Sequence, residues 1–462
     1  MTETTTTTYT PLAAPKNYLV FFGFNESDMT PEVECAARVR DQPILRHIMS
    51  TLAAVAFLAA PAFAQSGPQA VEKKLPDWVD YIDSLKPIGD RVIAKTWHST
   101  APQSRQETWR MMMATLAQGA LAEVYADPDY PEFISTYNTA LNLAAPNPDY
   151  MYSAALLRGD GVYRIRGFRG TNRYSELQLQ SGFYALGISG PALDKLDLAS
   201  LKTGPDGAFD VILSQKRPEG YAGDWWRLDP RAISVVLRQA SYDWVKERDA
   251  SVTIARLDVP APRPRLSAAD LSARLAQLAS WTEKGTATWY DHMNDLRKQG
   301  IINRVQVSNL TNFGGAIGQT YLEGTYNIGD GEALILETDV PQQCRYWSFL
   351  ITDDQYATVD WMNRQSSLNG FQAHLDADGK FRAVIAVKDP QVPNWLDTGG
   401  YRDGVIQVRW NNCTSGPIPT ARKVPLAEVR KYLPNDTPIV TAAQRDETLR
   451  NRRFGAQLRR RW

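Results

Sequence analysis

The polar and aromatic segment from Asn147 to Tyr152 carries the strongest potential for chemistry in this sequence. Asp149 can act as a general acid or base, and Tyr150 and Tyr152 can share or orient its proton. Arg166 adds a fixed positive charge for an anionic group, and Asn147 can bind a polar ligand. We therefore predict a substrate site in which Asp149, Tyr150 and Tyr152 are catalytic. The alternative is that Asn147 only forms an Asx-Pro turn.

Two tryptophan-containing segments form a second candidate for ligand binding. One contains Trp361 and Arg364, and the other contains Asn394 and Trp395. Indole faces stack on sugars or aromatic rings, while amide and guanidinium groups bind hydroxyls. These residues predict a surface for a glycan or an aromatic compound, although they can equally pin a loop onto a β-sandwich core.

The sequence lacks the short motifs of several common reaction classes. Beyond Gln65 its histidines are His98, His292 and His374, which are far apart and have no metal-ligand spacing. The zinc-protease His-Glu-x-x-His motif, the Gly-x-Ser-x-Gly elbow and the phosphate-binding glycine loop are absent. We therefore predict no metal site and no cofactor. The 51 basic and 51 acidic residues balance, which argues against a nucleic-acid partner.

A long helix is predicted just before the first candidate segment. Ser104 and Glu107 match a capping box at its start. Trp109 and Met113 fall on its apolar face, which is expected to be buried. We expect this helix to continue to Tyr125, where a proline-containing segment follows.

The rest of the chain reads mostly as short strands separated by turn residues. Alternating apolar and polar residues after Met151, and again from Ile301 onward, predict two sets of strands. A second helical stretch, capped by Ser267, separates them. The predicted fold class is mainly β with helical segments (α+β), in which helices join two antiparallel jelly-roll or sandwich-like β units.

An apolar run from Thr51 to Ala60 has a basic residue before it and a small-x-small site after it. This pattern is typical of a secretory signal peptide and is too short to span a membrane. We predict a signal peptide at residues 49–64, with cleavage near Ala64-Gln65. The mature protein is then periplasmic or secreted and has no integral membrane segment.

The residues upstream of this run have a different character. A threonine-rich start is followed by a segment from Asn17 to Glu32 that resembles the opening of the outer-membrane-protein-A-like, peptidoglycan-binding domain. The Gly-His-Thr-Asp segment of that family's glycan site is absent, so the resemblance does not imply peptidoglycan binding. We interpret residues 1–48 as a disordered leader or as a gene-model artefact with the true start near Met49.

Two cysteines, Cys344 and Cys413, remain in the predicted mature chain. In an oxidising compartment they can form a disulfide, but two buried free thiols fit their spacing equally well.

Several short segments, taken in order, resemble the bacterial family of domain of unknown function 1214, which is related to domain of unknown function 1254. The resemblance covers about residues 127–410 and implies an envelope or secreted protein with a jelly-roll-like β fold. It transfers no catalytic residue. The segments that carry it include Asn147-Pro148-Asp149, Asp353-Asp354, Asn369-Gly370 and Pro393-Asn394-Trp395-Leu396.

The expected organisation of the mature chain alternates helical and β regions and ends in an arginine-rich helix or tail. We expect the tail to be a solvated helix with a frayed end, although a phosphate or lipid surface is an alternative. The expected regions are residues 65–145 (mainly helical), 146–262 (first β unit), 263–300 (helical connector), 301–418 (second β unit, the 1214 domain) and 419–462 (basic C-terminal helix or tail).

These patterns predict an exported bacterial protein of uncharacterised activity. The leading hypothesis is an enzyme that acts on a small polar or aromatic compound in a pocket between the two β units. The alternatives are a carbohydrate- or envelope-polymer-binding protein and a structural or interaction protein. The expected partner is therefore a small molecule or a glycan.

Overall fold

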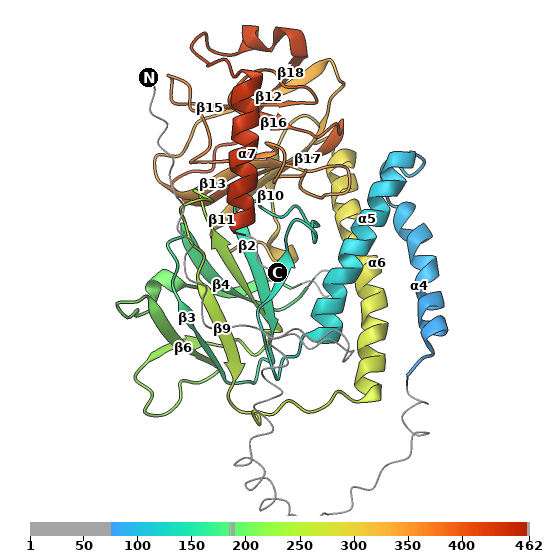
Figure 1. The fold of residues 1–462 in the computed structure, drawn as a ribbon, viewed down its shortest axis with the longest axis vertical. Helices are drawn as coiled ribbons and strands as arrows, with labels where there is room; N and C mark the ends of the chain where they lie inside the picture. Colours follow the sequence, from blue (N-terminus) through green and yellow to red (C-terminus); the bar gives the residue numbers. More distant parts are fainter. Residues whose placement is uncertain (1–74, 184, 186–189, 460–462) are drawn as a thin grey trace, which may run out of the picture. The chain divides into compact units, whose positions relative to one another are not determined.

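The computed structural model describes residues 75–183, 185 and 190–459 of the chain (Figure 1). Strands dominate these residues, and the predicted α+β class, mainly β with helical segments, is confirmed. The predicted leader at residues 1–48 and the predicted signal peptide at residues 49–64 lie outside the described residues.

The first set of strands forms a sandwich of two sheets, here called the first sandwich. Its sheet orders are β1-β2-β8-β4-β5 and β7-β6-β3-β9. Leu177 and Leu237 from one sheet meet Ile165 and Val211 from the other in a buried core, as expected when strands alternate inward and outward residues. Its elements are β1 (Ile134–Tyr137), β2 (Tyr150–Leu156), β3 (Tyr163–Phe168), β4 (Tyr174–Gln180), β5 (Ala192–Asp197), η4 (Leu198–Ser200), β6 (Ala208–Ser214), β7 (Asp224–Arg227), β8 (Ser234–Ala240) and β9 (Ser251–Arg256).

The second set of strands forms a second sandwich, with sheet orders β10-β11-β17-β13-β14 and β16-β15-β12-β18. Its core joins Phe349 and Val408 of one sheet to Leu334 and Ile385 of the other. Its elements are β10 (Gln306–Ser308), η5 (Thr311–Phe313), β11 (Gln319–Asn327), β12 (Glu332–Thr338), β13 (Cys344–Ile351), β14 (Ser367–Asn369), β15 (Phe381–Ala386), β16 (Trp395–Asp397), β17 (Asp403–Cys413), β18 (Thr420–Pro425) and η6 (Leu426–Tyr432).

The second sandwich repeats the first strand for strand. Each sheet of the second has the order of its counterpart in the first, with every strand nine places later along the chain. The parallel pair β6 and β7 recurs as the parallel pair β15 and β16. The residue register recurs as well, because Tyr152 pairs with Arg238 in the first sandwich and Tyr321 pairs with Arg409 in the second. The two sandwiches are therefore two copies of one structural unit.

Helices pack against one side of this pair of sandwiches (Figure 1). Ile88, Met112 and Trp281, from three different helices, share a buried cluster with Tyr356 and Val405 of the second sandwich. The helices therefore brace the region in which the two sandwiches meet. They are α4 (Trp78–Ile93), α5 (Pro102–Gly119), the π-helical η2 (Ala120–Tyr125) and α6 (Ala268–Lys298).

The predicted start and buried face of α5 are partly wrong. The helix begins at Pro102 after the N-cap Ala101, so Ser104 lies inside the first turn and is not the cap. Trp109 and Met113 are exposed, whereas the buried face carries polar residues such as Thr108. Thr108 donates a hydrogen bond to Gln355 at 3.0 Å. A polar face is buried here because tertiary partners satisfy its hydrogen bonds.

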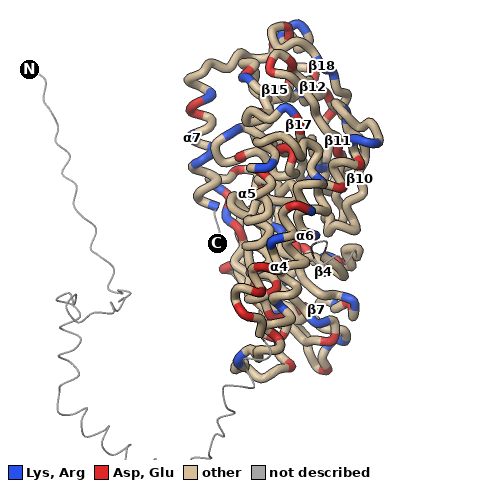
Figure 2. The backbone as a smooth tube through the Cα atoms, turned by 90° about the vertical axis from the view of Figure 1, so that its right-hand side faces the viewer, with Lys and Arg blue, Asp and Glu red and all other residues tan. Residues whose placement is uncertain are grey.

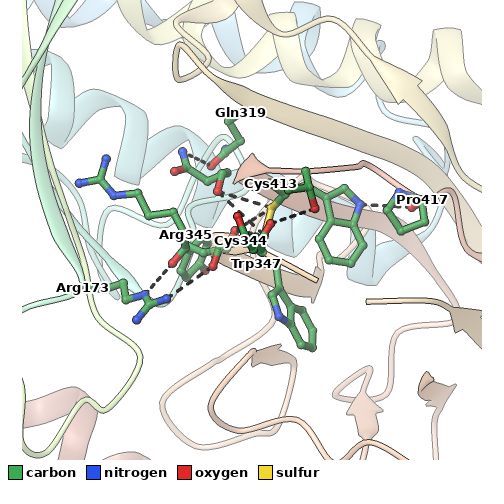
Figure 3. The surroundings of a disulfide bond; sticks show 12 residues. Arg173, Gln319, Cys344, Arg345, Trp347, Cys413 and Pro417 are labelled. Atoms are coloured by element: carbon green, nitrogen blue, oxygen red, sulfur yellow. Dashed lines mark hydrogen bonds between the residues drawn. A yellow bond between two sulfur atoms is a disulfide. The ribbon is translucent and has the colours of Figure 1, made fainter. Parts of the chain in front are cut away.

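Cys344 and Cys413, whose state the spacing left open, form a disulfide between β13 and β17 (Figure 3). They are directly opposite in the antiparallel register. Beside the disulfide, Arg173 of the first sandwich donates a hydrogen bond to the carbonyl oxygen of Arg345 at 2.6 Å. The disulfide therefore lies where the two sandwiches are in contact.

The C-terminal helix α7 (Ala442–Leu458) is exposed over most of its length, but one of its faces is buried. Thr441 caps it with a complete capping box. Figure 2 shows basic residues along it. Arg445 and Arg452 of the helix, and its C-cap Arg459, follow one another at intervals of seven residues and are buried. Arg445 binds Asp389 of the second sandwich, and Arg459 binds Asp249 of the first. The helix therefore links both sandwiches through buried guanidinium groups.

Among the described residues, no helix combines the length and apolarity needed to cross a membrane.

Replacing Arg452 on α7 is expected to destabilise the fold. Its guanidinium donates hydrogen bonds to the Trp361 carbonyl oxygen and to Ser367. In Arg452→Gln both buried acceptors lose a charged donor, so we expect the free energy of unfolding to fall by about 2–4 kcal/mol. Urea denaturation measures this loss. The control is Arg453→Gln, because the neighbouring Arg453 is exposed and its replacement is expected to change stability by less than about 0.5 kcal/mol. Equal effects of the two substitutions would contradict the proposed role of Arg452.

Candidate functional site

Asp149 lies at the junction between the two sandwiches and is fully buried. Its carboxylate accepts hydrogen bonds from Trp244 of the first sandwich at 2.7 Å, and from Tyr346 and Asn369 of the second at 2.6 and 2.7 Å. Burial raises the pKa of Asp149, although these three hydrogen bonds oppose the shift. Asp149 is absent from the linings of the five cavities described for these residues. Its contacts are therefore those of a residue that joins the sandwiches.

Three other residues of the first predicted site do reach a cavity. Asn147, Tyr150 and Tyr152 line a small cavity of about 40 Å³, together with Trp361 of the second predicted site. Tyr150 donates a hydrogen bond to Gln319 at 2.9 Å and is also bonded to the hydroxyl group of Tyr174. The structure thus brings together residues that the sequence analysis assigned to separate sites.

Arg166 does not join this group. It lies on β3, in the other sheet of the first sandwich, and is exposed. Arg238 and Arg409 take its place, because both line a cavity with Tyr150 and Tyr152. The sequence analysis missed both arginines. A signal existed, since each follows a run of mainly apolar residues within a strand, where a charged residue is rarely buried unless it is paired.

The two arginines cross the junction between the sandwiches in opposite directions. Arg238 of the first sandwich donates a hydrogen bond from Nη2 to the carbonyl oxygen of Gly314 in the second half of the chain. Arg409 of the second sandwich donates one from Nη2 to the carbonyl oxygen of Ala145, between β1 and β2 of the first sandwich, at 2.9 Å. Because Arg238 and Arg409 hold equivalent strand positions, the contacts are reciprocal. We call this arrangement the arginine clasp.

The backbone at both acceptors is left-handed. Ala145 has a φ of 46° and Gly314 has a φ of 83°. Glycine adopts this conformation freely, but alanine pays a steric cost in it. Ala144 and Tyr356, which line the same cavity, also have positive φ values of 65° and 63°. Such strain in non-glycine residues is concentrated at functional sites in proteins.

The clasp borders a cavity of about 80 Å³ between the two sandwiches. Arg238 and Arg409 are only 7% and 4% exposed, and within the described chain the Nη1 atom of each has no hydrogen-bond partner. Neither arginine forms an ion pair with any Asp or Glu side chain among the described residues. The cavity is therefore lined by two buried positive charges that have unused donor capacity. The lining residues are Tyr137, Ala144, Ala145, Pro146, Tyr150, Tyr152, Arg238, Trp289, Leu310, Phe313, Gly314, Gly315, Tyr321, Tyr356, Gln407 and Arg409.

A tyrosine accompanies each arginine at an equivalent position. The Tyr152 hydroxyl oxygen accepts a hydrogen bond from the backbone N–H of Asn147 at 3.0 Å. Tyr321 accepts one from the N–H of Ala316 at 2.9 Å, which repeats the same contact in the second half. Burial raises the pKa of Tyr152 to about 12, so its phenol stays neutral and can donate its proton to a ligand.

A chain of hydrogen bonds connects the cavity to the imidazole of His292. Tyr356 and Gln407, which line the cavity, both donate to Oε1 of Glu323, the latter at 2.7 Å. Oε2 of Glu323 lies 3.0 Å from Nε2 of His292. Burial alone would raise the pKa of Glu323, but hydrogen bonds and the charge of His292 outweigh it and lower the pKa to about 2. The ionised carboxylate of Glu323 therefore holds both the Tyr356 phenol at the cavity wall and the imidazole of His292 behind it.

A larger cleft of about 550 Å³ contains Trp361 and Arg364 of the second predicted site. Arg364 donates to Asp397 at 2.9 Å. Trp361 is 7% exposed, so little of its indole is available for stacking. Asp353 also lines this cleft, and its pKa is raised to about 8 by burial and by the neighbouring charge of Asp354.

Asn394 and Trp395 have contacts typical of a loop anchor. Asn394 donates to the carbonyl oxygens of His374 and Arg382 at 2.7 and 2.8 Å. The Trp395 indole donates to the Ala386 carbonyl oxygen at 2.9 Å, and the Arg445 guanidinium lies over its ring. The structure therefore does not bring these two residues to the cleft of Trp361 and Arg364.

Within the described part of the chain, no group of three or more His, Cys, Asp or Glu side chains is arranged to hold a metal ion.

Comparison with known proteins agrees with part of the resemblance seen in the sequence. Residues 327–409 match the family model described as "Protein of unknown function (DUF1214)". The DUF1214 resemblance is confirmed for this segment. It runs from the end of β11 to Arg409 of the clasp and includes Asp353, Tyr356 and Trp361.

Two solved structures of uncharacterised or unassigned proteins are similar to this chain. One, an uncharacterized protein from Burkholderia cenocepacia, is 27% identical with a TM-score of 0.71, and the match covers 76% of this chain and 97% of that one. The other, from Vibrio parahaemolyticus, is 12% identical with a TM-score of 0.39, and the match covers 68% of this chain and 98% of that one. No curated protein matches the chain.

The raised pKa of Asp353 predicts that stability falls as the pH rises toward about 8. An acid whose pKa is higher in the folded state than in the unfolded state stabilises the fold at low pH and loses that contribution as pH rises through the folded value. Between pH 6 and pH 9 we therefore expect the wild type to lose about 2–3 kcal/mol relative to Asp353→Asn, which cannot ionise. Urea denaturation of both proteins at the two pH values measures this difference.

Asp360→Asn serves as the control for this measurement, because Asp360 lines the same cleft but is exposed. It is expected to leave the pH profile of the wild type unchanged. A pH-independent gap between the wild type and Asp353→Asn would contradict the raised pKa of Asp353.

Proposed function

We propose that this chain is an enzyme that binds a small organic anion in the cavity between the two sandwiches and carries out acid–base chemistry on it. The proposal keeps the compound and the location expected from the sequence, namely a small polar or aromatic compound between the β units. It changes the residues that hold the compound. Arg238 and Arg409 would bind the anion, and Tyr152 and Tyr321 would donate hydrogen bonds to it.

One observation carries the binding half of this proposal. Arg238 and Arg409 line one cavity, are buried and have no carboxylate partner in the described chain, and the Nη1 atom of each has no hydrogen-bond partner there. A buried charge without a partner costs several kcal/mol, and a bound anion removes that cost. Arginine is also suited to carboxylates, because its planar guanidinium can donate two parallel hydrogen bonds.

The hydrogen-bonded chain behind the cavity supports the catalytic half. Tyr356 lies at the cavity wall, hydrogen-bonded to Glu323, which in turn pairs with His292. The His292 side chain is 15% exposed, so it can exchange a proton with solvent. Glu323 would stay ionised and orient the other two groups, in the way that a carboxylate orients a catalytic histidine.

The acid–base role of Asp149 expected from the sequence stays a prediction. Its carboxylate accepts hydrogen bonds from both sandwiches, and a positioning role for the segment from Asn147 to Tyr152 accounts for these contacts. If Asp149→Asn retained ligand binding and lost turnover alone, the acid–base role of Asp149 would be supported. We expect instead that Asp149→Asn lowers stability and affects binding and turnover together, because a buried acceptor is lost.

A carbohydrate-binding function is the second candidate. The specific observation in its favour is the cleft of about 550 Å³, a volume typical of small-molecule sites, which is lined by Trp361, Arg364 and several neutral polar groups. The low exposure of Trp361 counts against it, because sugar binding by stacking needs an open indole face. A purely structural role remains the third candidate.

The test of the leading proposal is a binding screen of the purified full chain with small organic acids and neutral sugars. We expect acids to raise the melting temperature and to bind in calorimetric titrations. In Tyr152→Phe and Tyr321→Phe the affinity should fall about tenfold, and in Arg238→Gln and Arg409→Gln about ten- to a hundredfold, because hydrogen bonds to a charged group are lost. Proton NMR in D₂O then measures turnover or exchange of the bound acid.

Arg217→Gln is the control for the arginine substitutions, because Arg217 is exposed on the first sandwich, away from the cavity. It should leave the affinity unchanged. Protection by neutral sugars and by no acid would overturn the proposal and favour the carbohydrate candidate.

We also propose that the protein is exported and cleaved near Ala64-Gln65. The disulfide between Cys344 and Cys413 supports this, since stable disulfides are typical of the periplasm and of secreted proteins and rare in the cytosol. We likewise propose that the chain is related to domain of unknown function 1254, and that residues 17–32 are similar to the outer-membrane-protein-A-like domain. The two sandwiches extend beyond the β units expected at residues 146–262 and 301–418, because β1 (Ile134–Tyr137) belongs to the first and β18 (Thr420–Pro425) to the second.

N-terminal sequencing of the protein from its native host tests the export proposal. We expect the chain to begin at Gln65 or a near neighbour, because signal peptidase cleaves after a small-x-small site. Thiol labelling of the same sample should leave Cys344 and Cys413 unmodified until a reductant is added. If the isolated protein begins at Met1, the export proposal is wrong.

A further inference from the structure

We infer that the ligand of the cavity between the sandwiches is a short dianion with two anionic groups, such as a small dicarboxylate, held at one end by each half of the duplicated fold. This inference rests on the function proposed above and specifies the ligand class of the same site. It comes from three observations: the duplication, the charge of the cavity and its size.

The duplication supplies two equivalent anion-binding pairs. Tyr152 is opposite Arg238 in the register of β2 and β8, and Tyr321 is opposite Arg409 in the register of β11 and β17. In each pair the phenol accepts one backbone N–H, and within the described chain no acceptor lies in range of its proton. Each pair can therefore donate one O–H and at least one N–H to a ligand. The pairs belong to different sandwiches, and all four residues line the one cavity.

The charge of the cavity requires about two negative charges for balance. The two carboxylates nearest in the sheet register are each matched in charge by another cation. Glu323 pairs with His292 at 3.0 Å, and Glu176, opposite Arg238 on β4, lies 3.6 Å from Lys195, although neither of its oxygens has a hydrogen-bond partner among the described residues. A monoanion would leave one buried guanidinium uncompensated, whereas a dianion compensates both.

The size of the cavity limits the distance between the two anionic groups. Its volume of about 80 Å³ is several times the roughly 10–15 Å³ that one water molecule needs on the same measure. This suits two carboxylates joined by a short carbon chain and excludes a long one. Aromatic side chains on the remaining wall, Trp289 and Phe313, suit the apolar centre of such a ligand.

The experiment compares dianions with monoanions by calorimetric titration of the full chain. The probes are oxalate, malonate, succinate and glutarate, with acetate and propionate as monoanions and sulfate and phosphate as single-centre anions. We expect one dicarboxylate to bind at least about tenfold more tightly than either monoanion, with an optimum at one chain length. In Arg238→Gln or Arg409→Gln this preference should disappear while weak monoanion binding remains.

The duplication adds a second expectation. Because the arginine–tyrosine pairs are equivalent, Arg238→Gln and Arg409→Gln should reduce dianion affinity by the same factor to within about threefold, and so should Tyr152→Phe and Tyr321→Phe. The tyrosine variants keep the test decisive if either arginine variant fails to fold. Circular dichroism establishes the fold of each variant first.

The possible failures separate this inference from the proposed function. If monoanions bind as tightly as dicarboxylates and the arginine variants lose both, the dianion inference is wrong and the proposed function stands. If sulfate or phosphate binds more tightly than any dicarboxylate, the inference of a dianion with two anionic groups is wrong and the proposed function stands. If no acid binds at all, both proposals fail.

Discussion

The junction between the two sandwiches depends on two arginines that cross it in opposite directions. Arg238 and Arg409 leave equivalent central strands and donate hydrogen bonds to the carbonyl oxygens of Gly314 and Ala145. Those carbonyls are presented by left-handed residues, and Ala145 adopts that conformation despite its side chain. The clasp buries two charges and leaves one nitrogen of each unpartnered in the described chain. The same constraint that joins the halves therefore creates an anion-attracting cavity between them.

Other contacts hold the junction so that the clasp keeps its geometry. Asp149 accepts hydrogen bonds from Trp244 on one side and from Tyr346 and Asn369 on the other. Along α7, buried arginines bind both sandwiches, and Arg459 also donates to the backbone carbonyl of Asp149 at 2.8 Å. Buried charged groups satisfied on several sides tolerate little movement, because any displacement leaves a donor or acceptor unpaired. A cavity held in this way is preorganised for a ligand.

The sequence alone predicted the features that depend on neighbouring residues. Alternation along the chain revealed the strands and hence the α+β class, since it reflects one buried and one outer face of each strand. The segment from Asn147 to Tyr152 was also visible, because its polar groups are adjacent. The arginines that line the cavity with its tyrosines could not be predicted from the sequence. Arg238 and Arg409 lie in separate strands and come together only after both sandwiches have formed. Arg166 was expected at the site of Asp149, yet β3 belongs to the sheet on the other side of the first core.

By itself, the sequence determined the strand content, the α+β class and the identity of the DUF1214-like segment, because these follow from local periodicity and from short motifs in order. It left the pairing of Cys344 with Cys413 open, misjudged the exposed Trp109 and gave no hint that Arg452 and Arg459 would be buried. Only the tertiary structure decided these points, since burial depends on which distant surfaces meet. It also decided the site: two halves with one topology bring equivalent arginine–tyrosine pairs to a single cavity, and no local pattern encodes that meeting.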